Sequence, residues 1–337
     1  MTLSEALRII VEGTSLSRGE AASVMRTLMS GEGTPAQMAA LLVALRMKGE
    51  TVDEIAGFAE TMRAMATRVH TTRRPLVDTC GTGGDHSGTF NISTTAAFVV
   101  AGAGVAVAKH GNRSSSSKCG SADVLEALGI CIDATPEIVG ACIDEVGIGF
   151  LFARSLHGAV KHVAPVRTEL GLRTVFNILG PLTNPAGADA QVMGIFDPGL
   201  VEPIAHVLLA LGVRHAFVVS GRDGLDELSL SGPSLVAEAC AGAVRCYELS
   251  PEQLGLRAAP VSALMGGDVV ENAALLRGVL SGELGPRRDV VLLNSAPALV
   301  AGGAADTLEQ GLKLAAGAID CGAALAKLDA LRRASHQ

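Results

Sequence analysis

The first seventy residues carry apolar positions at helical spacing together with helix-start signals. Capping boxes, in which a hydroxyl residue precedes a glutamate by three positions, begin at Ser17 and Thr51. Thr34 stands directly before a proline, an arrangement typical of a first helical turn. Glycines where helices should stop stand at Gly13, Gly31 and Gly49. The pattern predicts short helices near residues 3–12, 18–29, 35–48 and 52–67.

These predicted helices are rich in apolar residues for a fully solvated face. Ala39, Leu42, Val43 and Leu45 follow one another closely within the third helix. We therefore predict a helical domain over residues 1–70 whose helices pack against each other and against a partner chain. The plainer interpretation is a helical cap on the main domain.

From residue 71 to residue 337 the pattern changes to an alternation of apolar strands and helices. Strands are predicted at 76–78, 105–108, 217–220 and 290–294, and helices at 201–211 and 307–317. Such alternation indicates an α/β domain with a mostly parallel central sheet. Ligands of such sheets bind beyond the carboxyl ends of the strands.

Composition narrows the class of protein. Of the 337 residues 48% are hydrophobic and 3% aromatic, without tryptophan, so the core must be aliphatic. The formal net charge of −7 argues against a general nucleic-acid binder but permits a local cationic pocket.

The cysteines and the amino terminus point to a reducing compartment. An odd number of cysteines, seven, without a C-x-x-C pair indicates free thiols. No basic segment precedes an apolar stretch at the start, as a signal peptide would require. Residues 86–108 lack charged side chains, but too few of them are apolar to span a membrane. We expect a cytoplasmic protein without membrane or nucleic-acid partners.

Residues 78–129 hold the densest chemistry. Two glycine-rich or polar loops, GTGGD at 81–85 and NIST at 91–94, precede an apolar run at 96–108, and KHGNR at 109–113 with a serine run follows it. Glycines let several backbone N–H groups converge on one point, and a helix start adds partial positive charge. Hydroxyl and cationic side chains add further donors. The stretch therefore favours a phosphate-rich ligand over a plain glycine turn.

This loop differs from the common nucleotide-binding loops. The spacing of its glycines breaks the G-x-G-x-x-G dinucleotide pattern, and no Gly-Lys-Ser/Thr tripeptide completes a Walker A loop.

In this order, GTGGD, NIST and KHGNR resemble the anthranilate phosphoribosyltransferase family. The resemblance continues along the chain through HGAVKHV at 157–163, PVR at 165–167, FNILGPLTNP at 176–185, GLDELS at 224–229, GDVVENA at 267–273 and LLN at 292–294. Any one motif of about four residues would be weak evidence for a family, but the ordered set is highly specific.

The resemblance implies an Mg²⁺-dependent transferase of tryptophan biosynthesis. Such an enzyme moves the phosphoribosyl group of phosphoribosyl pyrophosphate to the amine of anthranilate. It also implies a homodimer with a small helical amino-terminal domain, to which residues 165–190 return as part of a hinge. The remaining chain would be the catalytic α/β domain.

The same resemblance assigns roles to individual residues. His110 and Asn112 would be catalytic. The phosphoribosyl pyrophosphate site would comprise Gly81, Gly83, Gly84, Asp85, Thr89, Asn91, Ser93, Thr94, Lys109, His110, Gly111, Asn112, Arg113, Ser114, Ser115, Ser116, Ser117 and Ser121. Anthranilate would contact Gly81, Asn112, His157 and Arg167, and Mg²⁺ would be bound by Ser93, Asp226 and Glu227. A planar guanidinium suits a carboxylate on an aromatic ring, and oxygen ligands suit Mg²⁺.

The chain departs from the family pattern on the acceptor side. Arg154 and Gly158 replace prolines that are usual around His157, and His86 with Ser87 follows the first loop where small residues are usual. Without these prolines the backbone at 154–158 is looser, which bears on the pocket of the aromatic acceptor, whereas the phosphoribosyl side of the pattern is intact.

Two alternatives stay open at this level. Pyrimidine nucleoside phosphorylases share the fold type but carry Lys-His-Gly-Gly at the position of residues 109–112, and they lack the pair Asp226-Glu227. A non-enzymatic paralogue that binds nucleic acid would show a basic face and eroded metal ligands, which the net charge and the acid pair disfavour.

Overall fold

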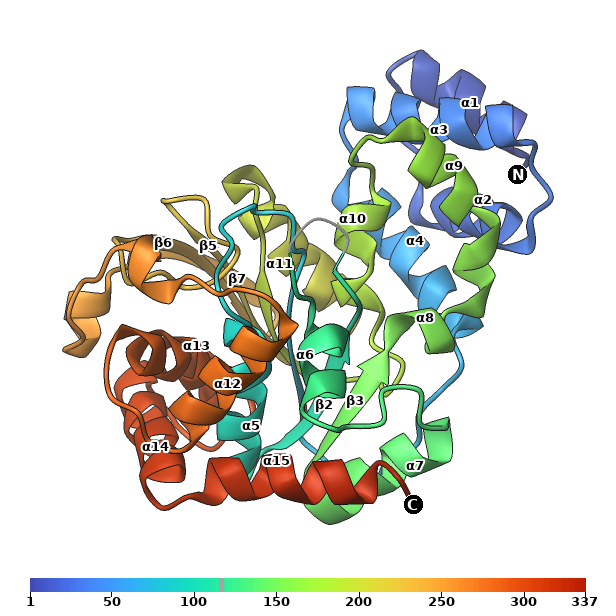
Figure 1. Cartoon of the computed structure of the whole chain (residues 1–337). Coiled ribbons are helices and arrows are strands. Elements are labelled where there is room, and N and C mark those ends of the chain that lie inside the picture. The colour runs from blue at the N-terminus through green and yellow to red at the C-terminus, as the bar shows by residue number, and fades with distance from the viewer. Residues whose placement is uncertain (115–117) are drawn as a thin grey trace.

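The computed structural model describes residues 1–114 and 118–337, and its chain forms a helical lobe and a larger α/β body (Figure 1). The lobe begins with the amino-terminal helices, at the places that the capping signals predicted. Their bounds are α1 (Leu3–Val11), α2 (Arg18–Ser30), α3 (Pro35–Lys48) and α4 (Val52–Met65).

Capping geometry explains why these helices start where they do. The hydroxyls of Ser17, Thr34 and Thr51 each accept the N–H three residues on, which confirms the predicted caps. The capping glutamate of α4, Glu54, is fully buried and also accepts the Leu16 N–H (2.9 Å) and a hydrogen bond from Lys48 (2.9 Å). One side chain thus links α4 to the turn before α2 and to the end of α3.

A later part of the chain returns to the helical lobe. It leads from α8 (Ala153–Leu156), whose Leu156 is buried in a cluster of the α/β body, to α9 (Ala164–Leu170) and α10 (Phe176–Leu179), with short 3-10 helices at Gly158–His162 and Pro181–Thr183. Val163, Val166 and Leu179 are buried in the same apolar cluster as side chains of α1–α4. Figure 1 shows this segment, in green, running beside the blue helices.

The body is built on a mixed sheet. In the described residues seven strands pair in the order β3-β2-β1-β4-β5-β6-β7, parallel from β3 to β5 and antiparallel at β6 and β7. Their bounds are β1 (Leu76–Gly81), β2 (Ala106–Gly111), β3 (Ile148–Phe152), β4 (Ala190–Gly194), β5 (His215–Gly221), β6 (Ser234–Cys240) and β7 (Ala243–Leu249). The predicted strands at 76–78 and 217–220 are confirmed within β1 and β5, and the strand predicted at 105–108 is confirmed as β2, which begins one residue later at Ala106.

Helices cover both faces of the sheet, and Figure 1 shows the carboxyl-terminal ones gathered on one side. One face packs on α5 (Ile92–Gly102) and α13 (Pro286–Ala301), backed by α6 (Ser121–Ala127), α12 (Val269–Leu280), α14 (Leu308–Asp320) and α15 (Ala323–Ala334). The other carries α7 (Pro136–Ala141), the π-helix Cys142–Val146 and α11 (Val201–Ala210). Further 3-10 helices lie at Pro198–Leu200, Pro251–Leu254 and Val261–Leu264.

Side chains along β4 and β5 alternate between two aliphatic cores. Val192 and Phe217 join the cluster under α5 and α13, whereas Met193 and Val218 join the cluster that continues into the helical lobe. The lobe is thus continuous with one face of the sheet through α11. Helices predicted at 201–211 and 307–317 are confirmed as α11 and α14.

The predicted strand at 290–294 is wrong, because these residues lie inside α13. Residues Val290 to Asn294 are all buried, so the run shows no amphipathic period that would separate a helix from a buried strand. The Asn294 side chain donates to the Val290 carbonyl one turn earlier (2.9 Å), a contact that only helical backbone brings together.

In the described part of the chain, no helix combines the length and apolarity needed to cross a bilayer.

Candidate functional site

The loop after β1 has a backbone that only glycine accepts easily. Gly83 and Gly84 follow each other with positive φ angles of 63° and 78°. At Gly81, a Cβ would stand 2.5 Å from the Asp226 carboxylate. The sequence GTGGD therefore lets a carboxylate approach the backbone closely while the chain turns sharply.

The helix α5 presents its amino-terminal end to the same place. Asn91 occupies the cap position, but its side chain is turned to the Cys119 carbonyl (3.2 Å) and caps nothing. The Ser93 N–H donates instead to Glu227 Oε1 (3.2 Å). The positive end of an 11-residue helix is thus directed at an acidic group from a distant loop.

The acids Asp226 and Glu227 lie in the loop between β5 and β6. Asp226 Oδ2 accepts the Gly83 N–H at 2.7 Å, so the acid pair contacts both the glycine loop and α5. Asn294 holds the next residue, Leu228, through two backbone hydrogen bonds of 2.9 Å. The acid pair is therefore fixed from α13.

Burial dominates the ionisation of this pair. It raises the pKa of Asp226 well above its usual range, with the neighbouring negative charges adding to the effect. Burial also raises the pKa of Glu227 to about 7, although the Lys109 ammonium opposes the shift. Such a pair favours a cation that compensates its charge.

At the end of β2, Lys109 and His110 are anchored from inside the sheet. The buried Lys109 ammonium donates to the Thr79 carbonyl. The His110 N–H donates to Asp78 Oδ1 (3.0 Å), while Asp78 Oδ2 accepts from the Asn184 amide (2.8 Å). Because Asp78 is fully buried, its pKa is raised. Asp78 ties the ends of β1 and β2 to the segment that returns from the helical lobe.

The loop after β2 is held by α6. The Asn112 N–H donates to Ser121 Oγ (3.2 Å), and the Arg113 guanidinium pairs with Asp123 (2.9 Å) and Glu126 (2.8 Å). The charge of Arg113 is thus already shared with two acids. The predicted phosphate contacts Ser115, Ser116 and Ser117 lie outside the described residues.

Two histidines meet below this loop. The rings of His110 and His157 lie 5.2 Å apart between centroids. Burial lowers the pKa of His110 to about 3 and the pKa of His157 to about 4. Both rings are therefore neutral near pH 7, and His110 Nε2 has no hydrogen-bond partner among the described residues.

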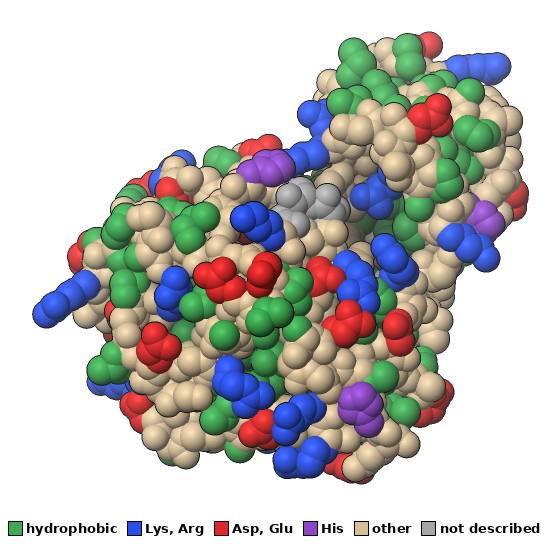
Figure 2. All heavy atoms as spheres, viewed as in Figure 1, with side chains coloured by type: hydrophobic (Ala, Val, Ile, Leu, Met, Phe, Trp, Pro, Cys, Tyr) green, Lys and Arg blue, Asp and Glu red, His purple; other side chains and the backbone are tan. Residues whose placement is uncertain are grey.

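Arg167 lies on α9, on the helical side. Its guanidinium carbon stands 5.1 Å from the centre of the Phe176 ring, and burial lowers its pKa. Figure 2 shows the surface hollowed between the helical lobe and the body, with cationic side chains along the border. Arg167 therefore lies on the helical lobe, across this hollow from the ends of the strands.

The residues expected from the sequence fall into two groups. Direct contacts join Asp226 and Glu227 to Gly83 and Ser93, and pair His110 with His157. Thr89 pairs with Met265 in an isolated β-bridge, and Arg167 contacts Phe176. The sequence interpretation missed Asp78 and Asn184, although an acid inside the apolar strand Leu76–Gly81 was a usable signal.

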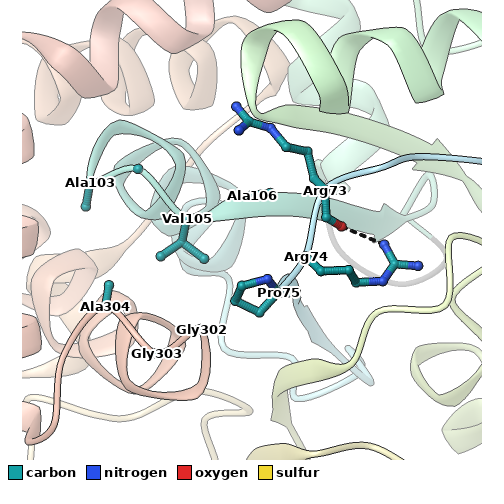
Figure 3. A pocket seen from close by; sticks show the side chains of 10 residues that line it. Arg73, Arg74, Pro75, Ala103, Val105, Ala106, Gly302, Gly303 and Ala304 are labelled. Atoms are coloured by element: carbon teal, nitrogen blue, oxygen red, sulfur yellow. Dashed lines mark hydrogen bonds between the residues drawn. The ribbon is translucent and has the colours of Figure 1, made fainter.

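A cavity of about 220 Å³ lies at the opposite edge of the sheet (Figure 3). Arg73, Arg74 and the backbone that follows the carboxyl ends of α5 and α13 line it. The two helix ends carry partial negative charge, which the arginines offset. This cavity is at the amino ends of β1 and β2, so it is not where a sheet of this type binds its ligand.

In the described ranges no three His, Cys, Asp or Glu side chains are grouped closely enough to hold an ion. Asp226, Glu227 and Ser93 would supply oxygen ligands of the type Mg²⁺ takes, and substrate phosphates and water would supply the others.

The sequence matches a known family in both regions. Residues 73–325 match the description "Glycosyl transferase family, a/b domain" and residues 4–66 match "Glycosyl transferase family, helical bundle domain".

Similar proteins cover nearly the whole chain. The anthranilate phosphoribosyltransferase of Symbiobacterium thermophilum is 60% identical over 98% of this chain and 97% of its own length. That of Moorella thermoacetica is 60% identical over 96% and 95%.

Solved structures agree with these similarities. The crystal structure of anthranilate phosphoribosyltransferase from Thermus thermophilus matches with a TM-score of 0.94 at 50% identity, over 98% of this chain and 99% of that one. The Saccharomyces cerevisiae enzyme in complex with PRPP and Mg matches with a TM-score of 0.88 at 27% identity, over 99% and 98%.

The buried histidines predict how stability depends on pH. Below pH 6.5 the unfolded chain takes up protons on both histidines, whereas the folded chain does so only near pH 4 and pH 3. Stability should therefore fall as the pH drops from about 6.5 toward 4, by up to about 1.4 kcal/mol per pH unit for each histidine.

Urea unfolding of His157→Gln at pH 7, 6 and 5 checks this expectation. The variant should lose stability less steeply than the unmodified protein, and His206→Gln, at an exposed position on α11, should not differ. Equal slopes for His157→Gln and the unmodified protein would contradict burial of a neutral ring.

Proposed function

The chain belongs to the anthranilate phosphoribosyltransferase family, and on this premise we propose that it transfers the phosphoribosyl group of phosphoribosyl pyrophosphate to the amine of anthranilate. The products are N-(5-phosphoribosyl)anthranilate and pyrophosphate, a step of tryptophan biosynthesis. One structural observation carries the proposal most strongly. The half-buried acid pair contacts the glycine loop and the start of α5 at once, so candidate metal ligands lie beside backbone N–H groups that can bind phosphate.

The donor side draws its support from the strand ends. Gly81, Gly83, Gly84 and Asp85 form the turn after β1, and residues 91–94 open α5. Backbone N–H groups of this kind bind phosphate oxygens. We propose that residues 109–114 with Ser121 hold the other side of the same ligand, as the family resemblance implies.

Mg²⁺ fits the donor set of Asp226, Glu227 and Ser93. Carboxylates whose pKa values are raised by burial, and further by neighbouring acids, gain from a hard cation. When bound, the ion neutralises charge on the pyrophosphate. The Saccharomyces cerevisiae relative bound to PRPP and Mg supports this assignment.

The chemistry needs positioning more than a strong base. The neutral aromatic amine nitrogen forms a bond to C1 of the ribose while the bond from C1 to the pyrophosphate oxygen breaks. Pyrophosphate leaves with the electron pair, and the amine loses a proton to it or to water. Holding amine and C1 in line accounts for much of the rate, and fixed donors stabilise the departing charge.

On the acceptor side we propose Arg167, Asn112 and the two histidines. Arg167 can bind the carboxylate of anthranilate with its planar guanidinium. Neutral His110 and His157 can accept hydrogen bonds from the amine. Arg154 and Gly158, which replace the usual prolines, are exposed in α8 and the following 3-10 helix, while His157 between them is buried. A Saccharomyces cerevisiae relative in complex with 4-fluoroanthranilate supports a site for such ligands.

We further propose a homodimer formed through the helical lobe and a cytoplasmic location. Met47 on α3 is 82% exposed, an apolar side chain that a partner chain would cover. Free cysteines suit a reducing compartment.

A fluorescence assay tests the activity. Anthranilate fluorescence should disappear when phosphoribosyl pyrophosphate and Mg²⁺ are added to the purified protein, and chelation of Mg²⁺ should stop the loss. Uracil or thymine nucleosides with phosphate serve as the control and should release no base. Unchanged fluorescence, or base release in the control, would refute the proposed reaction.

Arg167→Met tests the acceptor site. Loss of a charge-assisted pair should raise the KM for anthranilate roughly 10-fold to 100-fold, with the KM for phosphoribosyl pyrophosphate changing less than about 2-fold. Arg8→Met, on an exposed position of α1, is the matched control. Equal effects on both substrates would remove Arg167 from the acceptor site.

A further inference from the structure

Arg173 connects the helical lobe to the glycine loop. It lies in the turn between α9 and α10, and its guanidinium donates to the Gly84 carbonyl. The same nitrogen lies 3.4 Å from His86 Nε2. Its own backbone carbonyl accepts from the guanidinium of Arg46 on α3. One residue thus contacts the lobe with its backbone and the donor-side loop with its side chain.

The Arg173 side chain packs on Phe196, a residue that is hydrogen-bonded to the glycine loop after β1. Its guanidinium carbon lies 3.8 Å from the centre of the Phe196 ring, a cation–π distance. The Phe196 N–H donates to Thr82 Oγ1 (3.3 Å), and the Thr82 N–H donates to the Gly194 carbonyl (2.9 Å). Phe196 and the glycine loop are therefore held in one frame.

This contact fixes the direction of one peptide group. In a trans peptide the carbonyl and the following N–H point in opposite directions. With the Gly84 carbonyl turned to Arg173, the Asp85 N–H points away from Arg173. Gly83 and Gly84 both have left-handed backbone, so without such a contact this peptide could rotate at little cost.

We propose that Arg173 is a positioning residue for the donor site: it orients the Gly84–Asp85 peptide so that the Asp85 N–H is presented to the phosphates, with Phe196 as its support. The proposal rests on the proposed function for the identity of the ligand. Through Arg46 it also makes donor binding depend on how the helical lobe sits against the body.

The close fit at Gly84 agrees with this role. A Cβ on residue 84 would stand 2.9 Å from the Arg173 guanidinium nitrogen, so the absence of a side chain there is what admits the arginine. Although only six positions separate Arg173 from Arg167 in the sequence, the two guanidinium groups serve different substrates in this account.

Steady-state kinetics of Arg173→Met and Arg173→Lys test the role. Arg173→Met should raise the KM for phosphoribosyl pyrophosphate about 10-fold, the loss of one charge-assisted hydrogen bond, and change the KM for anthranilate less than about 2-fold. Arg173→Lys should recover part of the loss, because an ammonium can still donate to Gly84 but cannot stack as a plane. Arg26→Met, exposed on α2, is the matched control.

Calorimetric binding of pyrophosphate with Mg²⁺ separates this inference from the proposed function, since it needs no turnover. Arg173→Met should bind more weakly than Arg26→Met at an unchanged melting temperature. If Arg173→Met fails to fold, Phe196→Leu replaces it in the test. Loss of the cation–π contact in this variant should weaken pyrophosphate binding by about 3-fold. Equal pyrophosphate affinity in these variants, or equal rises in both KM values, would overturn the role of Arg173. An unmodified protein that binds pyrophosphate but transfers nothing would instead refute the reaction.

Discussion

Two half-buried carboxylates, Asp226 and Glu227, organise the edge of the sheet where the reaction is expected. Asp226 and Glu227 are half-buried and therefore only partly hydrated, so their oxygens need donors from the protein, and the donors they find are backbone N–H groups. Gly83 supplies one and Ser93 supplies the other. Because both acids need donors, the glycine loop and the start of α5 meet at one point. The Lys109 ammonium offsets part of the negative charge of Glu227.

The parallel register of the sheet makes this convergence possible. Gly81 pairs with Gly194, and Gly111 with Phe152, so the loops after β1 and β2 leave from the same edge. Asp78, inside β1, accepts from His110 and Asn184 and so fixes the second loop and the returning segment together. Donor contacts, acceptor contacts and the connection to the helical lobe thus depend on a few buried polar groups behind the strand ends.

Local signals in the sequence predicted much of this arrangement. The helices of the lobe carry caps in their own sequence, and the motif GTGGD indicates the backbone conformation of the glycine loop. The prediction of a strand at 290–294 was wrong because this run is buried on every side. Its hydrophobic pattern therefore shows neither the helical nor the strand period. The pairing of Arg173 with Gly84 joins residues 89 positions apart, and no local pattern encodes such a contact. The motif resemblance assigned Asp226 and Glu227 to the metal site. Only the folded structure shows that the two acids accept hydrogen bonds from different segments, Gly83 and Ser93.

The central claim is that these strand ends bind the activated sugar around the acid pair. A crystal structure of the protein with phosphoribosyl pyrophosphate and Mg²⁺ tests it most directly. We expect the ligand between the loop at 81–85 and the loop at 109–113, with Mg²⁺ on Asp226 and Glu227 and the anomeric carbon facing His110 and Arg167. A ligand bound elsewhere, or Mg²⁺ without contact to either acid, would contradict the account.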